Sequence, residues 1–155
     1  MRPVSRLGAR VVALAATLAP LPGLACSISL PASGTLRNSM SNTVLGSQVN
    51  GNTPATVTMV LPLLSGVSVT VNAPTVIQSP PGYNAAMETR EVAYTAAVIG
   101  LIQLANQGYT SAATNFSTGL LGAVTLTMTV HNRVNNPNGF APGTYTTRTL
   151  VTCHP

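Results

Sequence analysis

The clearest pattern in the chain is a strict alternation of apolar and polar residues near its C-terminus. Val124, Leu126, Met128 and Val130 share one parity, and the threonines between them share the other. Because successive side chains of a β-strand point to opposite faces, this period of two predicts a half-buried strand over residues 124–131. We expect its apolar face to belong to the core and its threonine face to lie at the surface.

A second alternating stretch covers residues 143–153 and follows the turn-rich segment 132–142. Tyr145, Val151 and Cys153 share one parity within it, so the cysteine lies on the face of the large apolar side chains. The two stretches together predict a C-terminal hairpin, in which residues 143–153 pair with residues 124–131.

Earlier parts of the chain show shorter patterns of the same kind. Asn50-Gly51 and Pro54 form a strong turn signal between two of them. Their richness in β-branched residues favours strands over helices. The predicted strands cover residues 26–30, 43–49 (weak, and interrupted at a glycine), 55–61 and 67–71. In the first of them Cys26, Ile28 and Leu30 share the apolar face.

Residues 87–106 fit two structures. The alanines and the Met87–Ala93 stretch suit a helix, whereas Val92, Tyr94, Ala96 and Val98 alternate as in a strand. We prefer the strand because the neighbouring segments are strands and helix propensity is a weak guide, but the helix stays open. Residues 101–104 could add a short helical turn.

Two segments are predicted to be irregular. Residues 72–84 contain Pro80-Pro81-Gly82, which cannot continue a strand ladder, and we expect this segment to cross between sheets. Residues 107–118 are small and polar, as in an exposed loop. About seven short strands with many turn signals and no convincing long helix predict an all-β sandwich or barrel.

Residues 1–25 have the composition of a secretory signal peptide. Arg2, Arg6 and Arg10 give a basic start, residues 11–18 are apolar, and the small Ala25 follows the break. The apolar run is short for a membrane span, although an amphipathic helix or membrane anchor would share part of this pattern. We expect export to the periplasm, the cell surface or the medium, and a mature chain without a transmembrane segment.

The remaining residues, 26–155, are enough for a single β-sandwich domain with its own core. The chain has two cysteines, Cys26 and Cys153, which bracket this domain. In an oxidising compartment such a pair usually forms a disulfide, here between the first and last strands. A lipidated Cys26 with a free Cys153, or two free thiols, are the competing possibilities, although Gly23-Leu24-Ala25 matches a lipoprotein signal poorly.

Charged residues are scarce after the predicted signal peptide. Four scattered arginines and no lysine stand against two glutamates, a net charge of +2. Nucleic-acid binding depends on clustered Lys and Arg, so we expect no nucleic-acid partner. The segment contains no Asp, so a Ser-His-Asp triad cannot form. We expect a protein that is not an enzyme and that holds no cofactor.

Two small sets of polar residues could be taken for sites. Glu88 and Glu91 would lie on opposite faces of a strand, so we interpret them with Arg90 as a solvated turn rather than as a catalytic carboxylate pair. Tyr145, Arg148 and Tyr109 could line a sugar surface, but the chain has no tryptophan for a stacking platform.

A metal site would need His131, His154 and Cys153 to converge, with the cysteine thiol free. His131 has the parity of the threonines in its strand, which indicates an ordinary exposed residue. We therefore expect no metal.

Two terminal stretches carry a resemblance to a known family. They are Cys26-Ser27-Ile28-Ser29-Leu30 and the segment from Pro142 to Thr152, which contains Gly143-Thr144-Tyr145 before an alternating Thr/Val strand. This resembles the spore-coat-U-type domains and the pilin subunits of archaic chaperone–usher systems. The resemblance implies an immunoglobulin-like antiparallel sandwich, which a neighbour's strand completes in the pilins.

Two function classes follow from these expectations. The first is a non-catalytic structural protein of the bacterial surface, such as a pilus or coat subunit, whose partner is another copy or an envelope protein. Its threonine-rich strands have no lysine to prevent edge-to-edge pairing, although a disulfide between the termini would leave no free N-terminal strand to donate. The second is a monomeric envelope sandwich that binds a ligand or a protein through residues 72–84 and 107–118.

Overall fold

The computed structural model describes residues 26–61, 66–98, 103–119 and 124–154, which form twelve β-strands and contain no helix. The predicted signal peptide lies outside these residues. The strands are β1 (Ser27–Ala32), β2 (Arg37–Asn38), β3 (Val44–Gly46), β4 (Ala55–Leu61), β5 (Ser68–Val71), β6 (Thr75–Gln78), β7 (Thr89–Val98), β8 (Gln103–Thr110), β9 (Thr114–Ser117), β10 (Val124–Asn135), β11 (Thr146–Arg148) and β12 (Val151–His154).

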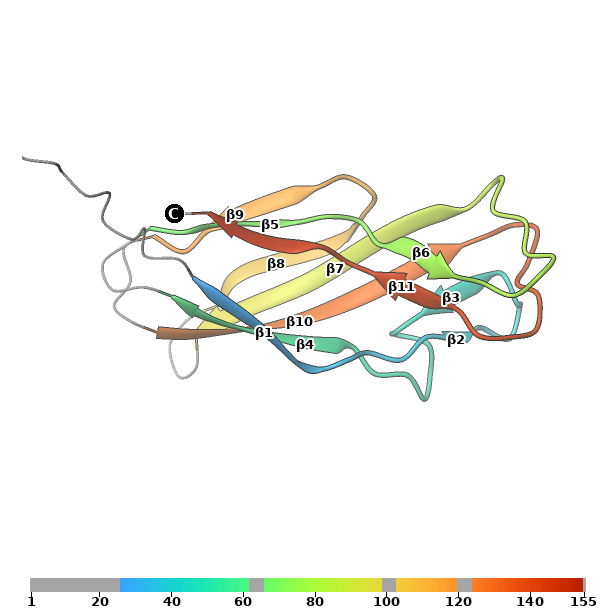
Figure 1. Ribbon diagram of the computed structural model, residues 1–155, viewed down its shortest axis with the longest axis horizontal. Coiled ribbons are helices and arrows are strands. Elements are labelled where there is room, and N and C mark those ends of the chain that lie inside the picture. Colours follow the sequence, from blue (N-terminus) through green and yellow to red (C-terminus); the bar gives the residue numbers. More distant parts are fainter. Residues whose placement is uncertain (1–25, 62–65, 99–102, 120–123, 155) are drawn as a thin grey trace, which may run out of the picture.

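The fold is an all-β sandwich of two antiparallel layers (Figure 1). The first layer is a seven-stranded sheet around β10, the longest strand. Strand β7 pairs with one edge of β10 along ten positions, while β4 and then β3 pair with the other edge. Strands β1 and β8 lie outside β4 and β7, respectively.

The second layer consists of two short sheets placed end to end. One has the order β12-β5-β9, and the other pairs β11 with β6. The Asn72 amide donates to the Leu150 carbonyl (3.0 Å) at the junction, so the hydrogen-bond ladder continues between them. In Figure 1 the two short sheets run along the length of the first layer.

The predicted faces of residues 124–131 are confirmed in β10. Leu126 and Met128 are completely buried, while Thr127 and Thr129 lie on the opposite, outer face. The preference for strand over helix in residues 87–106 is also confirmed, although the segment holds two antiparallel strands, β7 and the start of β8, instead of one. Part of the suggested helical turn at 101–104 lies outside the described residues, and Gln103 and Leu104 belong to β8.

The predicted C-terminal hairpin is wrong. Residues 143–153 do not pair with β10, because β4 and β3 occupy one of its edges and β7 occupies the other. The chain crosses instead to the second layer, where β11 pairs with β6 and β12 pairs with β5. An alternating pattern identifies the apolar face of a strand, but it does not identify the strand's neighbour.

Two segments that were expected to be irregular contain strands, β9 and β6. The total is twelve rather than about seven because β2 is also additional, and because residues 87–106 and 143–153 each contribute to two strands instead of one. Residues 107–118 hold the end of β8 and all of β9, and residues 72–84 hold β6. Thr114 is fixed in β9 by a hydrogen bond between its hydroxyl and that of Tyr94 (2.9 Å). Small polar residues can therefore form strands here because neighbouring strands supply the apolar contacts.

The interior contains two apolar clusters. The larger one fills the space between the layers, with fully buried side chains such as Met59, Met128 and Val69. The smaller one lies around Leu45, Val134 and Phe140, and three aromatic rings pack together in it. The ring of Tyr83 stacks on Phe140 (5.6 Å between centroids), and Tyr145 meets both rings edge-on.

Candidate functional site

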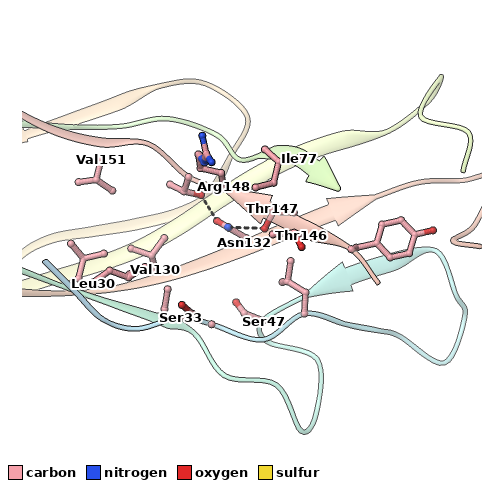
Figure 2. A pocket seen from close by; sticks show the side chains of 16 residues that line it. Leu30, Ser33, Ser47, Ile77, Val130, Asn132, Thr146, Thr147, Arg148 and Val151 are labelled. Atoms are coloured by element: carbon pink, nitrogen blue, oxygen red, sulfur yellow. Dashed lines mark hydrogen bonds between the residues drawn. The ribbon is translucent and has the colours of Figure 1, made fainter. Parts of the chain in front are cut away.

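A groove of about 440 Å³ lies on one side of the sandwich, between the two layers. Leu30 lies at one wall of the groove, and Ile77 and Arg148 lie at the other (Figure 2). Val57 and Val130, which are buried residues of the main core, form part of its floor. The groove is therefore an opening that leads to the interior of the sandwich.

The walls of the groove are edge strands. Within the described ranges, β1 pairs only with β4, β12 only with β5, and β11 only with β6. Each of these three strands therefore has a second edge without a strand partner in the described part of the molecule. Backbone N–H and C=O groups on such an edge can pair with another strand.

Strand β1 differs from the sequence-based expectation. Ile28 and Leu30 share the apolar face of the predicted strand with Cys26, yet Ile28 is 42% and Leu30 is 59% exposed. All six residues of β1 are exposed, and among the described strands β1 pairs with β4 alone. Leu30 instead borders the groove, so part of the predicted apolar face is a groove wall.

The opposite side of the sandwich is arranged differently. There the chain passes from β8 in the first layer directly to β9 in the second. The ring of Phe116 in β9 packs against Tyr94 of the core (5.9 Å between centroids). The connection between β8 and β9 thus joins the layers on that side, whereas β1 and β12 leave the groove side open.

The disulfide Cys26–Cys153 joins the layers at one end of the groove side. It links the residue before β1 to the last strand, with 6.5 Å between the Cα atoms, and both cysteines pack against the main core. From this end β1 and β12 run apart (Figure 1). The predicted disulfide is confirmed, and the alternatives of a lipidated Cys26 or two free thiols are wrong.

One polar residue projects into the groove from the core face of β10. Asn132 has the parity of Val130, and its amide bridges the layers by donating to Thr147 Oγ1 (3.2 Å) and accepting from Thr149 Oγ1 (2.6 Å). Figure 2 shows these bonds at the centre of the groove. The groove therefore has apolar side chains near Leu30 and Val151 and hydroxyl groups near Thr146 and Thr147.

The two glutamates do not form the expected solvated turn. The Glu88 side chain is 3% exposed, pairs with Arg90 and accepts a hydrogen bond from the Tyr83 hydroxyl. Burial, together with this bond to Glu88, raises the pKa of Tyr83 to about 12. Glu91 lies on the outer face of β7 and pairs with Arg133 (2.8 Å). Each carboxylate is thus committed to a different arginine.

The three residues considered for a sugar surface, Tyr145, Arg148 and Tyr109, do not lie together. Tyr145 and Arg148 both line the groove, but Tyr109 lies elsewhere, with the Arg133 guanidinium over its ring (3.8 Å to the centroid). Burial raises the pKa of the Tyr109 hydroxyl. The tyrosine therefore anchors an arginine of the first layer instead of contributing to the groove.

The candidate metal ligands do not form a metal site. Cys153 is in the disulfide, and His131 Nδ1 lies 3.1 Å from the Ser47 hydroxyl. His131 is half-buried, so the prediction of an ordinary exposed histidine is wrong, and this burial lowers its pKa. No group of three His, Cys, Asp or Glu side chains within the described ranges could hold a metal ion.

In the part of the chain that the structure describes, we find no helix with the length and apolarity needed to cross a membrane. Comparison with protein-family models and with curated protein sequences finds no match. The groove is consequently interpreted from its own geometry. Local sequence patterns do not predict the groove, because it depends on β1 and β12 lying in different layers. The signal available for it in the sequence is the apolar alternation of residues 26–30.

Proposed function

We propose that this protein is a secreted, non-catalytic structural protein of the bacterial surface, such as a pilus or coat subunit, whose groove takes up an extended segment of a neighbouring polypeptide. The observation that carries the proposal is the groove itself, which has edge strands as walls and core valines on its floor. Strand addition at such an edge gains affinity from main-chain hydrogen bonds, and alternate side chains give specificity.

The apolar residues at the groove support this role. Leu30 and Ile77 border it and are 59% and 51% exposed. A segment with apolar residues at every second position would cover both side chains and contact Val57 and Val130 below them. Each large side chain that is fully buried in this way contributes about 1.5–3 kcal/mol, so a few such contacts suffice for measurable binding.

The test is a titration of the purified, disulfide-bonded protein with the capped neutral peptide acetyl-Thr-Val-Ser-Val-Gln-Val-Ser-Val-Thr-amide. Leu30→Asp places a charge at the groove wall and should abolish binding. Val60→Asp is the matched control, because Val60 is 52% exposed on the neighbouring strand but does not line the groove. Binding by the control and not by Leu30→Asp is the expected result; equal binding by both variants, or no binding by the wild type, would refute the proposal.

The neighbouring segment can come from two sources, a second copy of the chain or a different protein. Sedimentation velocity over a concentration series separates them, since only self-association gives larger species as concentration rises. The disulfide supports the second source, because it holds β1 of each copy to its own β12.

A monomeric envelope domain that binds a partner through its loops is the second candidate. A shallow hollow of about 570 Å³ favours this candidate. Its lining includes residues 73–75 and Ser111, which belong to the two segments expected to bind a partner, together with Glu88 and Arg90. Ala85→Glu should block a partner in this hollow without affecting the groove. Loss of partner capture in this variant, with peptide binding intact, would favour the second candidate.

A further inference from the structure

Arg148 is the charged residue of the groove. It lies in β11, lines the groove and is exposed. Its neighbour Thr147 turns toward the interior and bonds to Asn132, so Arg148, with the opposite parity, points away from the core at the rim. Figure 2 shows its guanidinium on the Ile77 side, across the groove from Leu30 and Ser33.

This arginine has no acidic partner within the described ranges. The only ion pairs there are Arg90–Glu88 and Arg133–Glu91. The sequence contains just two acidic residues, and these are the same two glutamates. A second copy of the chain therefore has no uncommitted acidic side chain to place beside Arg148.

The geometry of strand addition indicates where a residue that pairs with the Arg148 guanidinium would lie. In a strand paired with β11, the residue opposite Arg148 points outward, and the residues on either side of it point inward to the groove floor. An outward carboxylate would then form a cross-strand pair with the guanidinium, while its flanking residues would meet Val57 and Val130. The complementary segment has the pattern apolar–acidic–apolar.

Resting on the proposed function, we infer that the segment bound in the groove carries an Asp or Glu between two apolar residues, that this carboxylate pairs with Arg148, and that it belongs to a different protein. The pair is exposed at the rim, so it selects among segments instead of supplying most of the affinity. An exposed cross-strand pair of this kind changes a dissociation constant by about twofold to fivefold.

The test compares three capped peptides, acetyl-Thr-Val-Ser-Val-Xaa-Val-Ser-Val-Thr-amide with Glu, Gln or Lys at Xaa. Capping removes the terminal charges, so the central residue is the sole difference. Titration calorimetry at low ionic strength should rank Glu tightest and Lys weakest, about twofold to fivefold apart at each step. High salt should reduce the differences between the three peptides.

Two variants assign the effect to Arg148. Arg148→Gln should bind the three peptides equally, and Arg148→Glu should reverse their order. Arg37→Gln is the matched control, since it removes one cation from β2 that does not line the groove, and it should keep the wild-type order.

The outcomes separate this inference from the proposed function. If all three peptides bind equally to the wild type, or if Arg37→Gln removes the preference as fully as Arg148→Gln does, the inference fails and the groove proposal stands. If none of the peptides binds, both fail. Growth of oligomers by the purified protein alone, lost in Leu30→Asp, would show that the segment comes from a second copy and would overturn the assignment to a different protein.

Discussion

Gly143 shows how a single residue fixes the entry of the chain into β11. Its φ of +143° is one that side-chain-bearing residues rarely adopt, and a Cβ atom placed there would lie 2.5 Å from Pro80 Cγ. The close approach brings residues 80–83 against residues 140–145, where the three aromatic rings pack. Glycine is needed at this position both for its backbone conformation and for the lack of a side chain.

Gly143→Ala should therefore destabilise the fold, by about 1–3 kcal/mol for a strained backbone position. Gly108→Ala is the control, because no atom lies within 4 Å of its Cβ position and its φ is not in the left-handed region. Urea unfolding of both variants measures the difference. Equal stability of the two would contradict the role given to Pro80 and Gly143.

His131 gives the protein a predicted pH dependence. Burial lowers its pKa from the ordinary 6.5, so the unfolded chain binds this proton more tightly than the folded one. The contribution to stability is complete above pH 6.5 and is lost as the pH falls from 6.5 through the lowered pKa of the folded state. Unfolding free energies measured across this range should fall on the acid side, and His131→Gln should reduce that slope. His154→Gln is the control, and an unchanged slope in His131→Gln would rule out this histidine as the cause.

At the scale of the elements, β10 organises the first layer because both of its edges are paired. Its inner residues contact the second layer, and its outer threonines lie opposite Thr56, Thr58 and Thr95 on the neighbouring strands. The two faces of this strand therefore differ sharply in their tolerance of charge.

Met128→Asp and Thr127→Asp test that difference at adjacent positions. Met128 is completely buried, so an aspartate would place an unpaired charge in the core and cost more than about 4 kcal/mol, enough to prevent folding. Thr127→Asp should change stability by less than about 1 kcal/mol, because its side chain is on the outer face. Circular dichroism and urea unfolding report both effects. Similar damage from the two substitutions would mean that the outer face is also covered.

The elements also show how far the sequence could predict this fold. The period of two in residues 124–131 and 55–61 identified strands and their core faces, because burial on one face imposes that pattern. Pairing was not predictable in the same way, and β11 and β12 were assigned to the wrong neighbour. The faces of Leu30 and Ile28 were misjudged because β1 has apolar alternation but borders a groove instead of a closed core.

At the scale of the whole molecule, the predicted disulfide links residues that are 127 positions apart. Closing so long a loop restricts the unfolded chain strongly, and we expect the bond to stabilise the protein by about 2–5 kcal/mol. Unfolding curves with and without reductant measure this difference. A Cys26→Ser and Cys153→Ser double variant should lose the same stability and become insensitive to reductant, whereas full stability after reduction would contradict the estimate.

The groove is a property of the whole molecule, because several strands from both layers line it. The connection from β8 to β9 joins the layers on one side, the disulfide joins them at one end, and β1 and β11 leave the remaining side open. The absence of lysine predicted strand edges without charged guards, but it did not predict which edges these would be. Their position depends on which strands share a layer, and local patterns do not contain that information.

Hydrogen–deuterium exchange tests the central claim most directly. The measurement compares backbone amides in the free, disulfide-bonded protein with those in the protein saturated by the Glu-containing peptide. Strand addition predicts slower exchange at alternate amides along β11 and β12 or along β1, with β8 and β9 unchanged, because only the groove-side edges gain hydrogen bonds. Slower exchange confined to residues 73–75 and 85–90, or binding without protection of any groove-side strand, would contradict the account.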